Sequence, residues 1–300
     1  MAVVSERSEV PLLLHSLTEV GELVQGALDI VGARTVVEIG SEAGGMTELL
    51  VAWARGHEAT VVSVDPAPPP RVRRLEQEGA PIRVVAAPSP EALEGVQGEA
   101  WIVDGDHNYA TVTAELRHVF ADVALPRLVI LHDVGWPCAR RDSYYAPERI
   151  AGHERHPHSR RGGIVPGEPG TTASGLSGRG RFAWAEREGG PCNGVLTAVE
   201  DIMAEVGDLR LDVIPCLFGV GFLFPAAAPW AGALEAHLAP WSGAPLLEAL
   251  ERNRLALYIR VIELQDALDA EQVERDRLVA ALHEQIGMLE SEALARRASP

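Results

Sequence analysis

Four apolar segments in the first half of the chain each end on an acidic or imidazole side chain. Apolar residues at helical spacing follow these segments, and strands that alternate with helices indicate a parallel sheet with right-handed crossovers. Because the carboxyl ends of parallel strands open onto one crevice, these side chains should converge on one site. The side chains at the four ends are Glu38, Asp65, Asp104, His132 and Asp133.

The same alternation predicts the order of the elements. Strands are expected over residues 35–40, 59–65, 82–87, 99–104, 127–132, 209–216 and 220–224. Helices are expected over residues 12–31, 46–56, 70–78, 90–95, 109–124 and 194–206. The last two strands are close enough in the sequence to pair as an antiparallel edge.

Residues 134–192 form an irregular segment dense in Gly, Pro, Arg and His, with little periodicity. A long loop of this kind in a compact domain is usually functional, and we interpret it as a lid over the substrate. Arg140 and Arg141 would read a carboxylate or phosphate of the acceptor, and Tyr144 and Tyr145 would stack on sugar faces.

The C-terminal segment, residues 246–300, is charged and rich in Ala, Leu and Glu, and it predicts one long helix. Glu271, Arg275 and Gln285 interrupt its heptad seam of apolar residues. We expect the segment to assemble a homodimer or larger homo-oligomer, through a parallel coiled coil or by packing on a partner's catalytic domain. Residues 1–245 would then form the catalytic domain. The apolar seam positions are Leu257, Val261, Leu264, Leu268, Leu278, Leu282 and Leu289.

Composition excludes several classes of partner. With 26 basic and 43 acidic residues, the formal charge of −17 disfavours nucleic acid and anionic membrane surfaces. The three cysteines, Cys138, Cys192 and Cys216, are widely spaced and form no CxxC pair, which fits a reducing compartment and argues against a thiolate zinc site. The sequence has neither a signal pattern nor an apolar run long enough for a membrane span, so we expect a soluble cytoplasmic protein.

The turn after the first strand reads Glu38-Ile-Gly40-Ser41-Glu-Ala-Gly44 and leads into a helix. Glycines there would let the backbone approach a ligand closely, and the helix offers its N-terminal N–H groups. Asp65 follows about twenty residues later, at the end of the next strand, where a carboxylate would accept both ribose hydroxyls. A tight strand–helix turn with a solvated Asp65 is the alternative, and the spacing favours a nucleoside site.

Three segments together resemble a known family. The Glu38-to-Gly44 turn with Asp65 resembles motif I and the acidic residue of class I S-adenosylmethionine-dependent methyltransferases. The segment from Asp104 to Tyr109, Asp-Gly-Asp-His-Asn-Tyr, resembles the DGDHxY segment of methyltransferase family 24. His132-Asp133 stands where metal-dependent members carry paired strand-end ligands. The resemblance covers roughly residues 30–225.

The resemblance implies a Rossmann-like α/β fold. Its seven-stranded, mostly parallel sheet would be flanked by helices, with the long C-terminal helix outside the family pattern. It also implies S-adenosylmethionine as cofactor, with Asp65 on the ribose and the segment around Ser89 beside the adenine. The expected cofactor-binding residues are Glu38, Gly40, Ser41, Gly44, Asp65, Pro88, Ser89 and Asp104.

A divalent metal site is expected at the ends of two neighbouring strands, from Asp104, His132 and Asp133. Carboxylates suit Mg²⁺, whereas the imidazole shifts the preference toward Mn²⁺ or Fe²⁺ unless His132 is not a ligand. The alternative is that Asp133 only caps the following turn. His107, three residues after Asp104, is the expected general base beside Asp104, unless it caps the next helix.

These features predict a metal-assisted O-methyltransferase that acts on a hydroxyl of a small molecule, such as a sugar or a glycosylated natural product. Two alternatives stay open. One is a family-24 enzyme of the cephalosporin hydroxylase-like type, with a different modification chemistry. The other is a non-catalytic, methyltransferase-like protein that serves assembly through its C-terminal helix.

Overall fold

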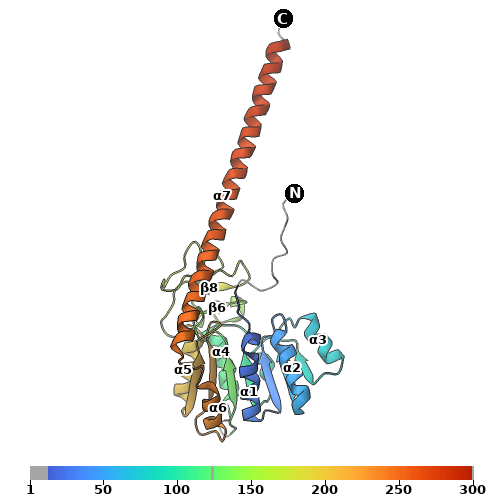
Figure 1. Ribbon diagram of the computed structural model, residues 1–300, viewed down its shortest axis with the longest axis vertical. Helices are drawn as coiled ribbons and strands as arrows, with labels where there is room; N and C mark the ends of the chain where they lie inside the picture. The colour runs from blue at the N-terminus through green and yellow to red at the C-terminus, as the bar shows by residue number, and fades with distance from the viewer. Residues whose placement is uncertain (1–12, 123–124, 299–300) are drawn as a thin grey trace.

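The computed structural model describes residues 13–122 and 125–298. Its main sheet has seven strands in the order β3-β2-β1-β4-β5-β10-β9, and β10 runs in the direction opposite to the other six. This is the predicted Rossmann-like methyltransferase arrangement (Figure 1). The strands are β1 (Thr35–Ile39), β2 (Thr60–Val64), β3 (Ile82–Val85), β4 (Ala100–Val103), β5 (Leu128–Leu131), β9 (Leu209–Ile214) and β10 (Val220–Pro225).

Helices cover both faces of this sheet and enclose two apolar cores. Alternate strand residues face opposite cores, as Val36 and Val37 of β1 do, because successive side chains of a strand point to opposite sides. The helices on one face are α1 (Gly21–Val31), α2 (Gly45–His57), α3 (Pro70–Gln77) and α6 (Ala231–Leu238). The helices on the other face are α4 (Tyr109–Val119) and α5 (Val195–Val206).

Several predicted helix boundaries differ from the structure. The helix predicted over 90–95 is one 3₁₀ turn, η2 (Glu91–Leu93), because Gly95 follows with a positive φ of 73°. The helix predicted over 12–31 begins as a 3₁₀ turn, η1 (Leu17–Val20), that leads into α1. Position 12 and positions 123–124, at the end of the helix predicted over 109–124, lie outside the described residues.

The segment predicted as an irregular lid, residues 134–192, contains regular structure. Its three short strands form a second sheet in the order β6-β8-β7, and buried Trp184 of β8 packs on the second core. The elements are β6 (Ser143–Tyr144), the 3₁₀ turn η3 (Pro147–Arg149), β7 (His158–Ser159) and β8 (Ala183–Ala185). The segment is therefore a folded layer above the carboxyl ends of the main sheet (Figure 1).

Buried hydrogen bonds tie this layer together. The guanidinium of Arg141, with a side-chain exposure of 1%, donates to the carbonyls of Ala185 (2.6 Å) and Pro169 (2.9 Å). Arg140 forms a bidentate pair with Glu200 at 2.6 Å. The expectation that these two arginines read an acceptor is therefore wrong for Arg141, which is enclosed, and Arg140 already has a carboxylate partner.

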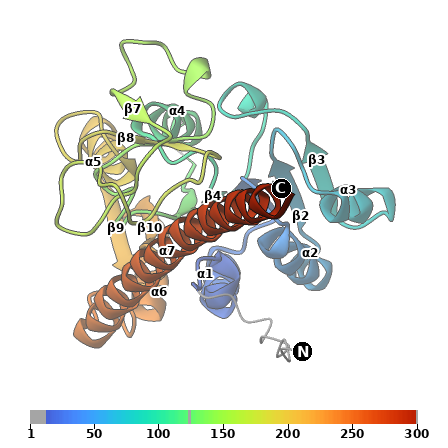
Figure 2. The same cartoon turned by 90° about the horizontal axis from the view of Figure 1, so that it is seen from above.

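The predicted C-terminal helix is present as α7 (Pro245–Ala298), 54 residues long. Its first turns pack on the body through Leu255, Ile259 and Ile262, each no more than 7% exposed. α7 starts beside the body and extends far beyond it (Figure 1), and seen from above its distal part projects over the sheet (Figure 2). Of the helices in the described part of the chain, none is long and apolar enough to cross a membrane.

Gly40 provides a test of this architecture. It has a φ of 88°, and a Cβ built on it would lie 2.1 Å from the carbonyl oxygen of Asp104. Gly40→Ala is therefore expected to lower the free energy of unfolding by about 2–4 kcal/mol, measured by urea denaturation. Gly56→Ala is the matched control, because a Cβ there meets nothing within 4 Å. It should raise stability by up to about 1 kcal/mol, and equal stabilities for the two variants would contradict the close approach.

Candidate active site

The predicted cofactor turn follows β1, and hydrogen bonds link it to Asp65 at the end of β2. The backbone N–H and the hydroxyl of Ser41 both donate to Oδ2 of Asp65, at 2.8 and 3.0 Å. The other oxygen of Asp65 accepts from the backbone N–H of Ala67 at 2.7 Å. A carboxylate has about four acceptor positions, so Asp65 is held in place and retains capacity for a further donor.

The glycines of this turn have a packing role that the sequence did not indicate. Gly40 faces the backbone of Asp104 and Gly105 at the end of β4, and Gly44 faces Val72 and Arg71 of α3. Both glycines have positive φ angles, which favour a residue without a Cβ. Close approach to neighbouring segments is therefore a sufficient reason for both glycines, whether or not a ligand also lies close.

Glu38 is a buried acid at the end of β1. One of its oxygens accepts from the hydroxyls of Thr47 (2.6 Å) and Ser63 (2.9 Å), and the other has no hydrogen-bond partner in the described part of the chain. Burial raises the pKa of Glu38 to about 7, because desolvation disfavours the charged form. The free oxygen is a polar position with unused hydrogen-bonding capacity next to the predicted cofactor turn.

Pro88 and Ser89 lie between β3 and η2, and there the structure adds a residue that sequence reasoning missed. The hydroxyl of Ser89 donates to Glu115 of α4, which is fully buried and keeps one unpartnered oxygen. Burial raises the pKa of Glu115 to about 8. A signal was available, because Glu115 lies on the apolar face of its helix, three residues after Val112 and four before Val119.

The ends of β4 and β5 bring together the residues predicted as metal ligands. Nδ1 of His132 lies 3.1 Å from Oδ1 of Asp104 and 2.9 Å from Oδ2 of Asp133. The ring of His107 lies 3.4 Å from the same Asp104 oxygen and 3.3 Å from the same Asp133 oxygen. Two imidazoles thus face the same two carboxylate oxygens. The structure brings Asp104, His107, His132 and Asp133 together, as expected from the strand ends.

Part of this cluster has the character of a cation site. Nε2 of His132 has no hydrogen-bond partner in the described residues, and Nδ1 of His132 and Nε2 of His107 lie close to the carboxylates without forming a well-aligned hydrogen bond, although all three atoms are buried. Around an octahedral ion with ligands at about 2.1 Å, neighbouring donor atoms lie about 3 Å apart, which matches the separations above. The donor atoms of Asp104, His132 and Asp133 therefore fit a divalent metal ion.

The charges of the cluster depend on one another. Burial opposes the charge of His107, but the carboxylates of Asp133 and Asp104 outweigh it and raise the pKa of His107 to about 9. Burial likewise opposes the charge of His132, whose pKa is raised by the same two carboxylates. In return, the imidazoles hold the pKa of Asp104 and that of Asp133 below the usual range, against the opposing effect of burial.

Asp133 has an unusual backbone conformation. Its φ of 61° lies in the left-handed region, which is uncommon for residues other than glycine but tolerated by aspartate. The next residues, Val134 and Gly135, are anchored to the carbonyls of Gly219 and Phe218 beyond the neighbouring strand β10. Asp133 therefore turns the chain at the site, while its carboxylate faces His132 and His107.

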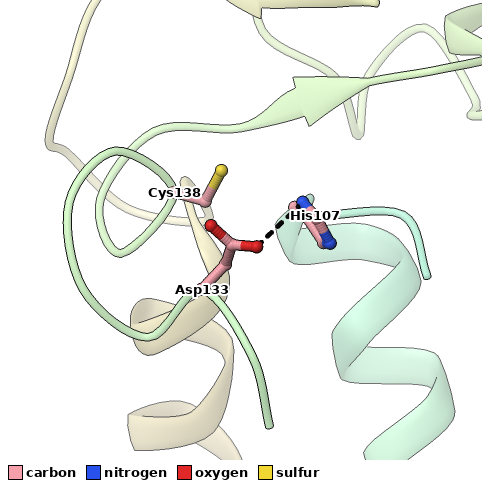
Figure 3. Close-up of side chains that lie close together, drawn as sticks. All are labelled: His107, Asp133 and Cys138. Atoms are coloured by element: carbon pink, nitrogen blue, oxygen red, sulfur yellow. Dashed lines mark ion pairs between the residues drawn. The ribbon is translucent and has the colours of Figure 1, made fainter. Parts of the chain in front are cut away.

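Cys138 also lies at the site, which the sequence did not indicate. Its thiol belongs to a second possible ligand group with His107 and Asp133. Figure 3 shows His107 facing the Asp133 carboxylate, with Cys138 beside it. Burial and the nearby Asp133 raise the pKa of the Cys138 thiol well above its usual value, so the neutral thiol is favoured in the absence of an ion.

Comparison with protein families supports the sequence resemblance. Residues 37–134 match the family model described as a methyltransferase domain. The match covers about a third of the chain, and this segment is similar to that domain, in agreement with the resemblance seen in the sequence. The matched segment includes most of β1 and the glycine turn. It also includes the ends of β4 and β5, which carry Asp104, His107, His132 and Asp133, the acid–imidazole cluster. Among curated proteins, none matches the chain.

Solved structures of methyltransferases are similar in part. Methyltransferase PaMTH1 of Podospora anserina, bound to SAH, has 14% identity and a TM-score of 0.42, over 72% of this chain and 82% of its own. Cofactor-bound Rv0187 from MTB has 18% identity and a TM-score of 0.40, over 72% and 84%. O-methyltransferase TomG of Streptomyces achromogenes, in complex with SAM, has 12% identity and a TM-score of 0.41, over 72% and 83%.

The two overlapping ligand groups make different predictions for metal binding. Asp104→Asn should weaken Mn²⁺ binding at least roughly 100-fold. Mutation of a residue that only supports a metal ligand lowers metal affinity by about 10–100-fold, and loss of the ligand itself should lower it at least as much. Cys138→Ala should leave the affinity within about threefold if the ion lies among Asp104, His132 and Asp133. Calorimetric titration of the two variants and the wild type with Mn²⁺ measures this. A large loss in Cys138→Ala alone would place the ion on the thiol side instead.

Proposed function

We propose that this protein is an S-adenosylmethionine-dependent O-methyltransferase, assisted by a divalent metal, that acts on a hydroxyl of a small molecule such as a sugar or a glycosylated natural product. One observation carries the proposal. The glycine turn of the methyltransferase segment touches the backbone of Asp104, which also belongs to the acid–imidazole cluster. A methyl donor at the turn would therefore lie beside the groups that activate an acceptor.

The cofactor would lie along the ends of β1 to β4. Asp65 has unused capacity to accept from a ribose hydroxyl, and Ser41 fixes its orientation. Glu38 offers a free oxygen toward the methionine end, with Gly40, Gly44 and Asp104 beside it. Pro88 and Ser89 would border the adenine, where Glu115 adds a buried acid that can hydrogen-bond an amino group in either protonation state.

The metal would be held by Asp104, His132 and Asp133. When bound, a divalent ion lowers the pKa of a coordinated hydroxyl and orients it for in-line transfer. Carboxylates favour Mg²⁺, and the imidazole ligand moves the preference toward Mn²⁺. His132 is only 5% exposed and sits between both carboxylates, which supports its inclusion as a ligand.

His107 would take the proton of the attacking hydroxyl at a ring nitrogen. Without a cation, the two carboxylates keep this imidazole protonated at neutral pH, because its pKa is raised to about 9. Neutralisation of Asp104 and Asp133 by a cation would remove that attraction and return His107 toward its ordinary pKa. The sequence-based expectation of a base near neutrality therefore agrees best with a site whose carboxylates are engaged by a cation.

The acceptor would bind between the cluster and the folded layer above it. The ring of Tyr145 is edge-on to His107, with centroids 6.3 Å apart, and also contacts Phe182 at 5.5 Å. Tyr145 is 49% exposed, so part of its apolar surface is open to a ligand. An aromatic wall beside a general base suits the apolar faces of a sugar or a ring-bearing acceptor.

Cofactor binding separates this proposal from its alternatives. Calorimetry with S-adenosylmethionine should detect binding, and incubation with a panel of glycosides should give methyl transfer that EDTA abolishes and Mn²⁺ or Mg²⁺ restores. Binding without transfer to any acceptor favours the non-catalytic assembly protein. Absence of cofactor binding would contradict both the O-methyltransferase and the non-catalytic assembly protein. It would leave the cephalosporin hydroxylase-like enzyme as the remaining alternative.

Asp65 is the test of the cofactor site. Asp65→Ala should weaken S-adenosylmethionine binding by about 1.5–3 kcal/mol, because charge-assisted bonds to the ribose are lost. Ser41→Ala is the matched control, since it removes one hydrogen bond to Asp65 and keeps the carboxylate and the backbone N–H. We expect Ser41→Ala to change affinity by less than about 1 kcal/mol. An Asp65→Ala protein with wild-type affinity refutes the ribose assignment.

His107 is the test of proton transfer. His107→Ala should lower kcat by roughly 10²–10⁴-fold, the usual contribution of a general base, while cofactor affinity stays near the wild-type value. Steady-state kinetics with saturating Mn²⁺, together with calorimetry, separates these two effects. Near-normal turnover in the variant would mean that His107 is not the base and that Asp104 or another group at the metal site accepts the proton.

A further inference from the structure

The distal part of α7 extends away from the body, to which it is tied at its start by the hydrogen bond that the Ser174 hydroxyl donates to Asp266. Every residue from 264 to 291 is exposed. Its apolar residues include Leu264, Leu268 and Leu282, which are 49%, 64% and 57% exposed. An apolar stripe of this length is unusual on an isolated helix in water, since soluble proteins cover such surfaces.

The stripe follows an alternating spacing of four and three residues from Leu257 to Leu289, which is the a/d seam of a coiled coil. Three polar residues interrupt it, and two of them, Glu271 and Arg275, are oppositely charged and adjacent on the seam. In a parallel pair in register, Glu271 would face the partner's Glu271, and Arg275 the partner's Arg275. Both layers would then oppose like charges.

An antiparallel pair removes this conflict. When the two helices cross at residue 273, Glu271 faces the partner's Arg275 and Arg275 faces the partner's Glu271. The same register pairs Leu264 with the partner's Leu282 and Leu268 with the partner's Leu278. Each of these layers joins a d position to an a position, which is the pairing that antiparallel coiled coils have. Two of the three residues that look like defects in a parallel coil become matched charges, and the third, Gln285, faces the partner's Val261.

We propose that a second copy of this chain covers the distal face of α7, in an antiparallel coiled coil centred on residue 273. The charge pair supports a second copy, because it is complementary to itself under a twofold axis. The overlap would extend from Leu257 to the partner's Leu289, about 48 Å of helix at about 1.5 Å per residue. Leu257 and Leu289 are 59% and 65% exposed, so both ends of the seam are accessible.

This arrangement differs from the parallel coil considered from the sequence. The face that α7 turns to its own body carries Leu255, Ile259 and Ile262, whereas the seam carries Leu257 and Leu264 on an exposed side. A partner helix can therefore approach without displacing the packing of α7 on the body. The inference uses no residue of the candidate active site, so it stands or fails independently of the proposed function.

A charge-exchange series tests the register in the full-length protein. Glu271→Arg and Arg275→Glu should each raise the dimer dissociation constant by roughly tenfold or more, because each opposes like charges twice in the dimer. The double variant Glu271→Arg with Arg275→Glu should return to within about threefold of wild type. Sedimentation equilibrium over a concentration series measures these constants.

The control variants change charge on the opposite face of the same helix. Glu284→Arg and Arg277→Glu alter the net charge as the test variants do, but neither lies on the seam, and both should leave the dissociation constant unchanged. In a parallel pair, each single test variant replaces one layer of like charges by another layer of like charges, so the dissociation constant should change little. Unchanged dimerisation in both single variants, or a monomeric wild type, would overturn the proposal.

Cysteine pairing gives a second measurement of direction. Under oxidising conditions, Leu264→Cys combined with Leu282→Cys in one chain should yield a disulfide-linked dimer, because the two positions meet across the antiparallel interface. Either single variant should form no more disulfide-linked dimer than the wild type, since each introduced cysteine then faces a leucine. Efficient crosslinking of Leu264→Cys alone would show a parallel pair and contradict the proposal.

Discussion

The candidate site depends on mutual neutralisation of four groups that burial would otherwise keep uncharged. Asp104 and Asp133 raise the pKa of His107 and His132, while the imidazoles lower that of both carboxyls. None of the four would be stable there alone, because an unpaired buried charge is costly. The arrangement requires β4 and β5 to lie side by side, with Val103 opposite Leu131, so that both strands end at the same level.

The parts of this site that follow from strand order were predictable from the sequence. Asp104, His132 and Asp133 directly follow apolar runs, and pairing of adjacent parallel strands is enough to bring them together. The positions of Cys138 and Glu115 at the site do not follow from strand order, although the apolar helix face that carries Glu115 indicates that this acid is buried. Cys138 reaches the site only because the chain reverses after Asp133, and Glu115 does so only because α4 packs on the sheet, and both depend on tertiary contacts.

The folded layer of residues 134–192 shows why composition misled in one place. A run of arginines, acid and tyrosines resembles a ligand-reading loop, yet Arg141 donates to backbone carbonyls and Asp142 accepts from the backbone N–H groups of Tyr109 and Gly194. A segment with few regular strands leaves many buried backbone groups without partners, and charged side chains can satisfy them. Tyr145, which keeps an exposed ring, is the member of that run whose position fits the sequence-based role.

The beginning of α7 forms part of the environment of the cluster. The ring of Phe218 lies edge-on to His132, with centroids 6.4 Å apart, and the guanidinium of Arg254 lies over the same ring at 4.7 Å. Glu251 accepts the backbone N–H of Phe218 at 2.9 Å and also pairs with Arg254 at 2.6 Å. Phe218 has a φ of 68°, so its loop adopts a conformation that needs support from its surroundings. The helix that carries the exposed seam therefore also holds the Phe218 loop that forms one wall beside His132, so the candidate site and the proposed dimer interface share a single element.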